Sequence, residues 1–311
     1  SLDGAEPVCE GEISYCATDA ETGDCTCDPI DPDDVSTETY CWDYDLYRYW
    51  EKFALIPLDL STPSTPALGS RVALAEDDEG VSMLGDGNTV WLSYKRPTEV
   101  TDSSNAFVRF YIQEVGLATP AAPELGVAVN VPGELIAKSG ETLFTRDYVY
   151  GDAIIETAIA KLRLDGELAY LEAFASFANQ QVSTIELDGA GKLLVSHRES
   201  WQTFEGDWHE NVQQLTILDA EAELEVLGVA EVDTWANLQD ARDGRALFTV
   251  PGGILVFNIE DATSPYPQAY FSTQGWPQSF TTAEDQVMFA AGPYGIYTFD
   301  LNTFNLWSDI D

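Results

Sequence analysis

Five aspartates lie close together near the start of the chain and are the strongest candidates for metal chemistry: Asp24, Asp28, Asp31, Asp33 and Asp34. Closely spaced carboxylates repel one another unless water or a cation separates them, and carboxylate oxygens are ligands that Ca²⁺ prefers. The stretch lacks the glycine and the terminal glutamate of an EF-hand loop. We keep two interpretations, a calcium site and a solvated acidic loop, and we expect no organic cofactor.

The two histidines of the chain, His197 and His209, flank the segment RESWQTFEGDW. We expect this segment to join two strands of one hairpin, which could bring both imidazoles to one metal ion together with a nearby carboxylate. The alternative is a loop folded over its own aromatic residues with both histidines at the surface.

The same segment contains three aromatic residues, Trp201, Phe204 and Trp208. Trp and Phe side chains supply large contact areas at interfaces, and Trp also has a polar N–H group. We therefore consider a binding surface here, for a sugar or for a protein.

All five cysteines lie in the first 41 residues: Cys9, Cys16, Cys25, Cys27 and Cys41. Cysteines gathered in a polar segment that lacks an apolar core indicate disulfides and an oxidising compartment. The Cys25–Cys27 spacing differs from the C-x2-C of zinc sites, and this region contains no histidine. The pairing stays open, and the odd number leaves one cysteine over.

Catalytic motifs give little support for an enzyme. The chain contains no G-x-S-x-G elbow, no H-E-x-x-H sequence, no P-loop and no dinucleotide-binding glycine pattern. A carboxylate pair for glycoside hydrolysis stays possible, because its separation depends on the fold. A propeller hydrolase of lactonase or glycosidase type, with a metal-assisted site at the channel mouth, is the alternative that we keep.

The net charge of the chain limits the classes of partner that it can bind. The chain has 14 Lys and Arg residues and 54 Asp and Glu residues, so its net charge is −40. Such a charge repels nucleic acid phosphates and anionic lipids. No apolar run is long enough to span a bilayer. We expect no nucleic acid partner and no membrane span, and we expect further sequence upstream of Ser1.

A short apolar strand pattern after a tight turn occurs five times, at spacings of 41 to 53 residues: NTVWLS (88–93), ETLFT (141–145), KLLVS (192–196), RALFT (245–249) and QVMFA (286–290). Each copy follows another short strand, so each forms a hairpin, and a third strand follows after a variable loop. A fourth strand usually completes the unit. Three to four antiparallel strands per unit predict the blades of an all-β β-propeller.

Two segments, TPSTPALGSRVAL (62–74) and TPAAPELGVAVNV (119–131), share a Thr-Pro-x-x-Pro-x-Leu-Gly frame. The first follows FALIPLDL (53–60), a third strand without a preceding hairpin. We therefore expect about 5.5 visible blades of a six- to eight-bladed ring. An upstream segment or a companion chain would complete the ring.

The segments LIPLDLSTPSTPALGSRV (55–72), GILVFNIEDATSPYPQAYF (253–271) and GIYTFDLNTFNL (295–306) resemble secreted bacterial β-propeller proteins with LVIVD-type repeats. The resemblance implies an extracytoplasmic location, including the bacterial cell surface, and a binding or scaffolding role.

We expect residues 1–50 to form an acidic, disulfide-stapled segment and residues 51–311 to form the blades. The predicted function is a protein-binding or structural scaffold, stabilised by calcium if the aspartates bind it, within a longer precursor.

Overall fold

The computed structural model describes residues 14–18, 25–29, 52–75, 77–98, 100–101, 107–150, 155–202, 208–210, 212–274, 279–283 and 285–303. The chain divides into two units, Ser1–Glu51 and Lys52–Asp311. In the first unit, β1 (Ser14–Thr18) and β2 (Cys25–Pro29) form an antiparallel pair. The predicted calcium ligands lie outside the described residues except for Asp28, which has a backbone position in β2.

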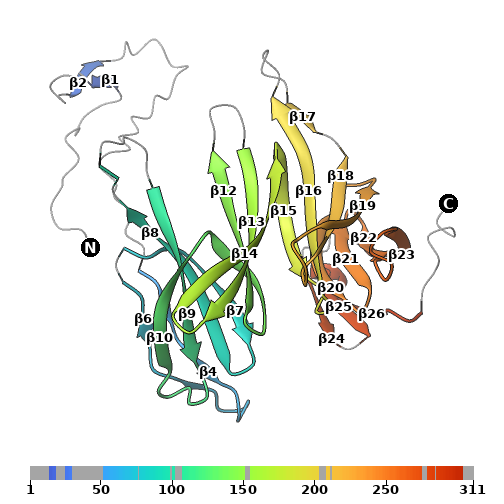
Figure 1. Cartoon of the computed structure of the whole chain (residues 1–311), viewed down its shortest axis with the longest axis horizontal. Helices are drawn as coiled ribbons and strands as arrows, with labels where there is room; N and C mark the ends of the chain where they lie inside the picture. The colour runs from blue at the N-terminus through green and yellow to red at the C-terminus, as the bar shows by residue number, and fades with distance from the viewer. Residues whose placement is uncertain are drawn as a thin grey trace. The chain divides into compact units, whose positions relative to one another are not determined.

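The second unit contains five successive antiparallel sheets, which we number in chain order (Figure 1). Sheet 1 consists of β7 (Glu79–Asp86), β8 (Thr89–Thr98), β9 (Phe107–Gly116) and β10 (Glu124–Val131). Sheet 2 consists of β11 (Glu134–Ser139), β12 (Thr142–Tyr150), β13 (Ile155–Asp165) and β14 (Leu168–Ala178). Sheet 3 consists of β15 (Gln180–Leu187), β16 (Lys192–Gln202), β17 (Trp208–Glu210), β18 (Gln213–Asp219) and β19 (Val226–Val232).

Sheet 4 consists of β20 (Asn237–Arg242), β21 (Arg245–Val250), β22 (Gly253–Asn258) and β23 (Tyr266–Ser272). Sheet 5 consists of β24 (Phe280–Ala283), β25 (Gln286–Ala290) and β26 (Ile296–Asp300), with the 3₁₀ turn η1 (Gly292–Tyr294) before its last strand. Each of the five predicted hairpins is present, and each is followed by the predicted third strand. The β-propeller fold is therefore confirmed.

The expected half blade precedes sheet 1. In it β3 (Ala54–Leu55) pairs with β6 (Val72–Ala73), and β4 (Leu58–Asp59) pairs with β5 (Ala67–Leu68). Val72 packs with buried residues of sheet 1, including Leu92 and Tyr94. The half blade therefore shares an apolar core with the first complete blade.

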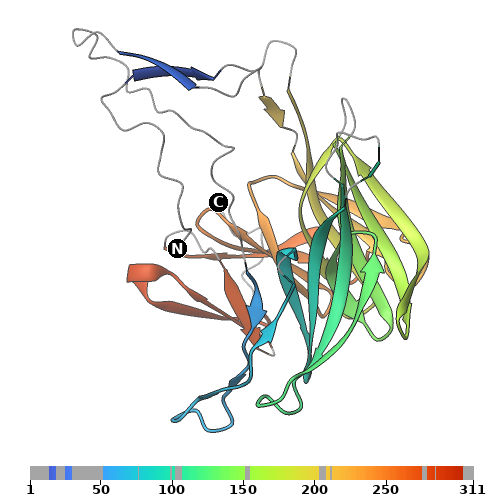
Figure 2. The ribbon, with the colours of Figure 1, turned by 90° about the vertical axis from the view of Figure 1, so that its left-hand side faces the viewer.

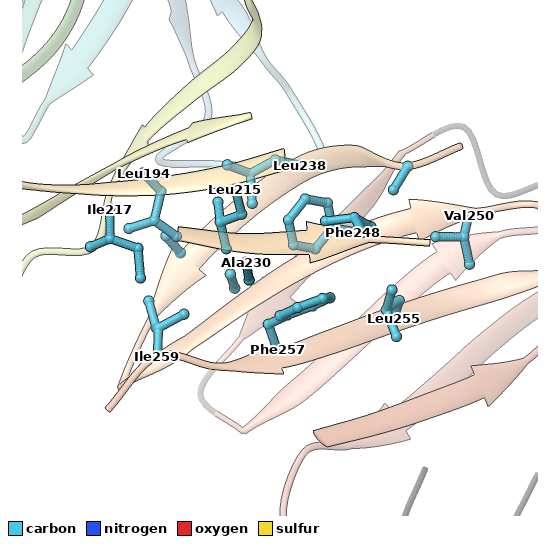
Figure 3. Close-up of a cluster of buried hydrophobic side chains, with 14 of the residues drawn as sticks. Leu194, Leu215, Ile217, Ala230, Leu238, Phe248, Val250, Leu255, Phe257 and Ile259 are labelled. Carbon is cyan, nitrogen blue, oxygen red and sulfur yellow. The ribbon is translucent and has the colours of Figure 1, made fainter. Parts of the chain in front are cut away.

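An apolar core lies between each pair of neighbouring sheets. A blade with a neighbour on each side therefore buries both of its faces. In β16, Leu193 and Val195 belong to the core shared with sheet 2, whereas Leu194 belongs to the core shared with sheet 4. Successive strand residues point to opposite faces, so the three consecutive residues Leu193, Leu194 and Val195 are all apolar. Figure 3 shows the core between sheets 3 and 4, where Leu194 lies with Phe248 and Phe257.

The first strands of neighbouring sheets approach one another. Strand β11 contacts β7 and β15, and β15 contacts β20. These strands correspond to the inner strands of propeller blades, whereas the fourth strands are the outer ones. Figure 2 shows the twist of the long strands in sheets 1 and 2.

A steric constraint requires glycine at position 69, in the first copy of the Thr-Pro-x-x-Pro-x-Leu-Gly frame. A Cβ atom on Gly69 would collide with the backbone carbonyl of Pro120, which belongs to the outer turn of the next sheet. Gly228 occupies the corresponding place in β19, where a Cβ atom would collide with the carbonyl of Ala262. At Gly69 and Gly228, therefore, the outer turn of one blade packs closely on the backbone of the preceding blade.

Two lysines connect neighbouring sheets through backbone carbonyls. Lys161 of sheet 2 donates from Nζ to the carbonyls of Glu221 (2.7 Å) and Ala222 (2.9 Å), in the turn after β18. Lys192 of sheet 3 donates in the same way to the carbonyl of Ile259 (2.7 Å), in the turn after β22. These scarce cations thus act at blade interfaces.

Candidate functional site

The predicted aromatic segment extends sheet 3 as a second hairpin. Strand β16 is long: its first part pairs with β15 and β18, and its last part pairs with β17. The register places Trp201 opposite His209 and Gln202 opposite Trp208. Trp201 and Trp208 thus have strand positions, whereas Phe204 lies outside the described residues.

His197 is buried at the base of this hairpin, with 4% of its surface exposed. Its Nδ1 lies 2.9 Å from Gln180 Oε1, an acceptor, and its Nε2 lies 2.7 Å from the hydroxyl of Thr216. In this arrangement Nδ1 donates and Nε2 accepts. The ring also packs against Phe177, with 5.0 Å between centroids.

Burial lowers the pKa of His197 to about 4, because removal from water disfavours the charged imidazolium. The ring is therefore neutral at pH 7, and both of its nitrogens have partners within sheet 3. Metal binding by His197 would require these hydrogen bonds to break. His197 is therefore not at the surface, as the loop alternative would have it, because Phe177 and the neighbouring strands cover its ring.

His209 lies opposite a residue four positions beyond His197 on β16. Four extended residues span about 13 Å along a strand. The pairing of the two histidines at one metal stays a prediction. In the described part of the chain, no group of three or more His, Cys, Asp or Glu residues is placed to hold a metal ion.

A surface cavity of about 310 Å³ opens beside the base of the hairpin. It is lined by residues of β16, β18 and β19, of the segment just before β18 and of the connection to sheet 4: Arg198, Val212, Gln213, Val232, Asp233, Thr234 and Trp235. A smaller cavity of about 130 Å³ has Arg198, Gln213 and Trp235 in common with it and extends toward His197. We call these two adjoining cavities the Trp235 groove.

Trp235 and Arg198 dominate the groove. The indole of Trp235 is 49% exposed, and the guanidinium carbon of Arg198 lies 4.3 Å from the ring centroid. Arg198 also donates from Nε to Gln181 Oε1 (3.1 Å). The Arg–Trp contact and this hydrogen bond both hold the guanidinium beside the indole.

Gln213 fastens the connection that carries Trp235. Its Nε2 donates to the carbonyl of Ala236 (2.5 Å), and its Oε1 accepts from the Ala236 amide (3.0 Å). The same Nε2 also donates to Ser196 Oγ (2.7 Å). The side chain of Gln213 thus binds both backbone groups of Ala236, the residue that follows Trp235.

The sequence pattern does not identify Trp235, because TWANL (234–238) precedes a repeated hairpin turn and is typical of a strand. The strand β20 begins at Asn237, so Trp235 belongs to the connection between sheets. An isolated Trp in a polar inter-blade connection was the signal that could have identified it.

Asp77, Asp78 and Glu79 form an acidic triplet at the start of sheet 1. Asp78 is buried and accepts from Arg96 Nε (2.5 Å) and from the amide of Ala75 (2.9 Å). Arg96 lies over the rings of Tyr94 and Tyr111. The charge of Asp78 is thus balanced by an arginine.

Glu186 and Asp240 form a carboxylate pair on the inner strands β15 and β20. Burial raises the pKa of Glu186 to about 7, with a further contribution from the negative charge of Asp240. Asp240 accepts from Thr282 Oγ1 (2.8 Å) and is paired with Arg242 Nε (2.6 Å). Glu186 is therefore expected to titrate near neutral pH.

Comparisons with known proteins give a distant likeness of fold. No protein-family model and no curated protein sequence matches the chain. BamB from Moraxella catarrhalis is 13% identical, with a TM-score of 0.38, covering 79% of this chain and 78% of BamB. Sqt1 from Saccharomyces cerevisiae is 10% identical, with a TM-score of 0.33, covering 73% of this chain and 80% of Sqt1.

A functionally unknown protein from Desulfotomaculum acetoxidans is 9% identical, with a TM-score of 0.34, covering 76% of this chain and 86% of that protein. Such likeness concerns the fold alone, so the function must be argued from this chain's residues. In the described residues no helix is both long and apolar enough to cross a bilayer.

Proposed function

We propose that this chain is an extracytoplasmic, protein-binding β-propeller that binds a polypeptide at the Trp235 groove and the adjoining β16–β17 hairpin. The observation that carries this proposal is the half-exposed indole of Trp235, held beside Arg198 at the edge of a surface cavity. Exposed Trp and Arg side chains are characteristic of the residues that dominate protein interfaces.

The groove offers contacts suited to a peptide. Trp235 and Val212, both 49% exposed, supply apolar area, and Gln181 and Asp233 supply polar groups at the margin. A net charge of −40 favours a ligand with positive charge, because complementary charge speeds association and suppresses wrong partners. We therefore expect a peptide that combines apolar and basic side chains.

The extracytoplasmic location rests on the cysteines, since five cysteines in a polar segment suit an oxidising compartment. A structural role within a longer precursor, with an added segment or chain completing the ring, agrees with a blade array that starts with a half blade. Calcium bound by the acidic segment would add stability to that unit. The metal-assisted hydrolase stays the alternative from sequence.

Selection from a phage-displayed random peptide library tests the proposal. The wild-type chain is the target, and the Trp235→Ala variant removes peptides that bind elsewhere. The control variant is Tyr266→Ala, which removes an aromatic residue of similar exposure from sheet 4. We expect enriched peptides to bind wild type and Tyr266→Ala alike, and to bind Trp235→Ala at least tenfold more weakly.

Two outcomes would contradict the proposal. One is that no peptide distinguishes wild type from Trp235→Ala. The other is that a glycan array detects Trp235-dependent sugar binding when the peptide selection detects none, which would make the groove a carbohydrate site.

A further inference from the structure

The backbone of β1 and β2 places two cysteines directly opposite each other. In this antiparallel pair Cys16 is the partner of Cys27, at the centre of a ladder that runs from Ser14 opposite Pro29 to Thr18 opposite Cys25. Directly opposed residues lie on the same face of an antiparallel pair, with Cα atoms about 4.5 or 5.5 Å apart. A disulfide requires Cα atoms about 4.4–6.8 Å apart.

The neighbouring cysteine fits this geometry less well. Cys25 is the partner of Thr18, two positions away from the partner of Cys16. Such a diagonal separation is about 7–8 Å, which exceeds the span of a disulfide. Cys25 and Cys27 follow each other along one extended strand at about 6.6 Å, near the upper limit of the span. The register thus favours one pairing over both others within the hairpin.

We infer that Cys16 and Cys27 form a cross-strand disulfide that closes the β1–β2 hairpin. Formation joins the two sulfur atoms and removes one hydrogen from each thiol. The two protons and two electrons pass to a disulfide oxidant, either a small molecule or a thiol–disulfide oxidoreductase, which is reduced to two thiols. This step proceeds through a mixed disulfide between the oxidant and one of the two cysteines.

The disulfide explains how this hairpin persists in an acidic, polar segment. An isolated two-stranded hairpin is marginally stable in water, and a cross-link restricts the unfolded chain. Cys9, Cys25 and Cys41 then remain as the candidates for a second disulfide and for the cysteine left over. The inference is independent of the proposed peptide binding.

Peptide mapping of the full chain, exported to an oxidising compartment, tests the pairing. Free thiols are first blocked with N-ethylmaleimide at low pH, and the chain is then digested with proteases that cleave after Glu and before Asp. These cuts separate residues 13–18, which contain Cys16 alone, from residues 24–27, which contain Cys25 and Cys27. We expect both peptides as one cross-linked species, which separates on reduction.

Two matched variants assign the bond within residues 24–27. We expect the cross-link to persist in Cys25→Ser and to disappear in Cys27→Ser. The inference is overturned if Cys16 of the exported wild-type chain carries N-ethylmaleimide. It is also overturned if Cys16 is linked to Cys9, Cys25 or Cys41. If a variant fails to fold, fragmentation of the cross-linked wild-type species between Cys25 and Cys27 assigns the bond.

Discussion

The buried imidazole of His197 and the half-buried carboxyl of Glu186 respond to pH in opposite directions. Burial disfavours the charged form of each group. It therefore lowers the pKa of His197 to about 4 and raises the pKa of Glu186 to about 7. The two residues lie on neighbouring strands of sheet 3, β16 and β15, and each has a distinct consequence for stability.

Replacing His197 with Ala should destabilise the fold by about 2–4 kcal/mol at pH 7, because it removes two hydrogen bonds and leaves a cavity. Between pH 6.5 and 4 the folded state binds fewer protons at His197 than the unfolded state does. The stability that His197 supplies is thus fully present above pH 6.5 and is lost as the pH falls toward 4.

Urea unfolding of wild type and His197→Ala at several pH values measures this difference. We expect the gap between the two proteins to shrink as the pH falls from 7 to 4.5. A gap that stays constant over this range would contradict the neutral, buried imidazole.

Replacing Glu186 with Gln should stabilise the fold at pH 8 by up to about 3 kcal/mol, with little effect at pH 4.5. Because the folded pKa is raised, the folded state binds more protons than the unfolded state between pH 4.5 and 7. Wild-type stability at this site therefore falls as the pH rises through that range.

The control for this prediction is Glu223→Gln, which changes an exposed glutamate in the turn after β18. Thermal unfolding at pH 4.5 and pH 8 compares both variants with wild type. If Glu186→Gln and Glu223→Gln behave alike at pH 8, Glu186 does not carry a raised pKa.

At the scale of elements, blades meet through close backbone contacts and through lysines. The outer turn of sheet 4 packs directly on Gly228, and Lys161 holds the turn after β18 by its carbonyls. Both contacts lie between sheets, so both should report on how firmly neighbouring blades associate.

The variant Gly228→Ala should lose about 1–3 kcal/mol of stability, because the new Cβ collides with the carbonyl of Ala262. The matched control is Gly126→Ala, at the same position of the Leu-Gly frame in β10. There the nearest atom to a Cβ would be the carbonyl of Glu114, 3.3 Å away. Chemical unfolding should show a cost of at most about 1 kcal/mol for this control, and equal costs would contradict the assigned packing.

Replacing Lys161 with Met should cost about 1–3 kcal/mol, because two carbonyls lose a charged donor at a buried interface. Arg163→Met on the same strand is the control. Arg163 is 45% exposed, and its ion pairs with Asp165 and Glu172 lie at the surface, so its loss should cost less than about 1 kcal/mol. Urea unfolding of both variants distinguishes an interface lysine from a surface one.

At the scale of the whole molecule, the net charge of −40 opposes the compact state through self-repulsion. Raising sodium chloride from about 0.01 M to about 1 M shortens the Debye length from about 30 Å to about 3 Å. We expect the melting temperature to rise over this range.

Calorimetry at constant ionic strength, with EDTA or with calcium, separates screening from a calcium site. Screening responds to ionic strength alone, whereas a calcium site responds to calcium at far lower concentration. A melting temperature that is independent of sodium chloride would contradict self-repulsion as the dominant electrostatic effect.

Sequence alone determined the blades of this protein. Turn residues and apolar strands are local features, so the five hairpins, the third strands and the half blade could be located before any contact was known. Even the Leu-Gly frame was visible, although the close packing of Gly69 on Pro120 lies between blades.

Tertiary structure decided the candidate site. Trp235 and Arg198 are 37 positions apart, and their contact depends on Gln213 fastening the connection between two sheets. Burial likewise keeps His197 neutral, and its ring nitrogens bond to Gln180 and Thr216 on neighbouring strands. These properties depend on cross-strand and inter-sheet contacts and on burial, which a residue's local sequence does not determine.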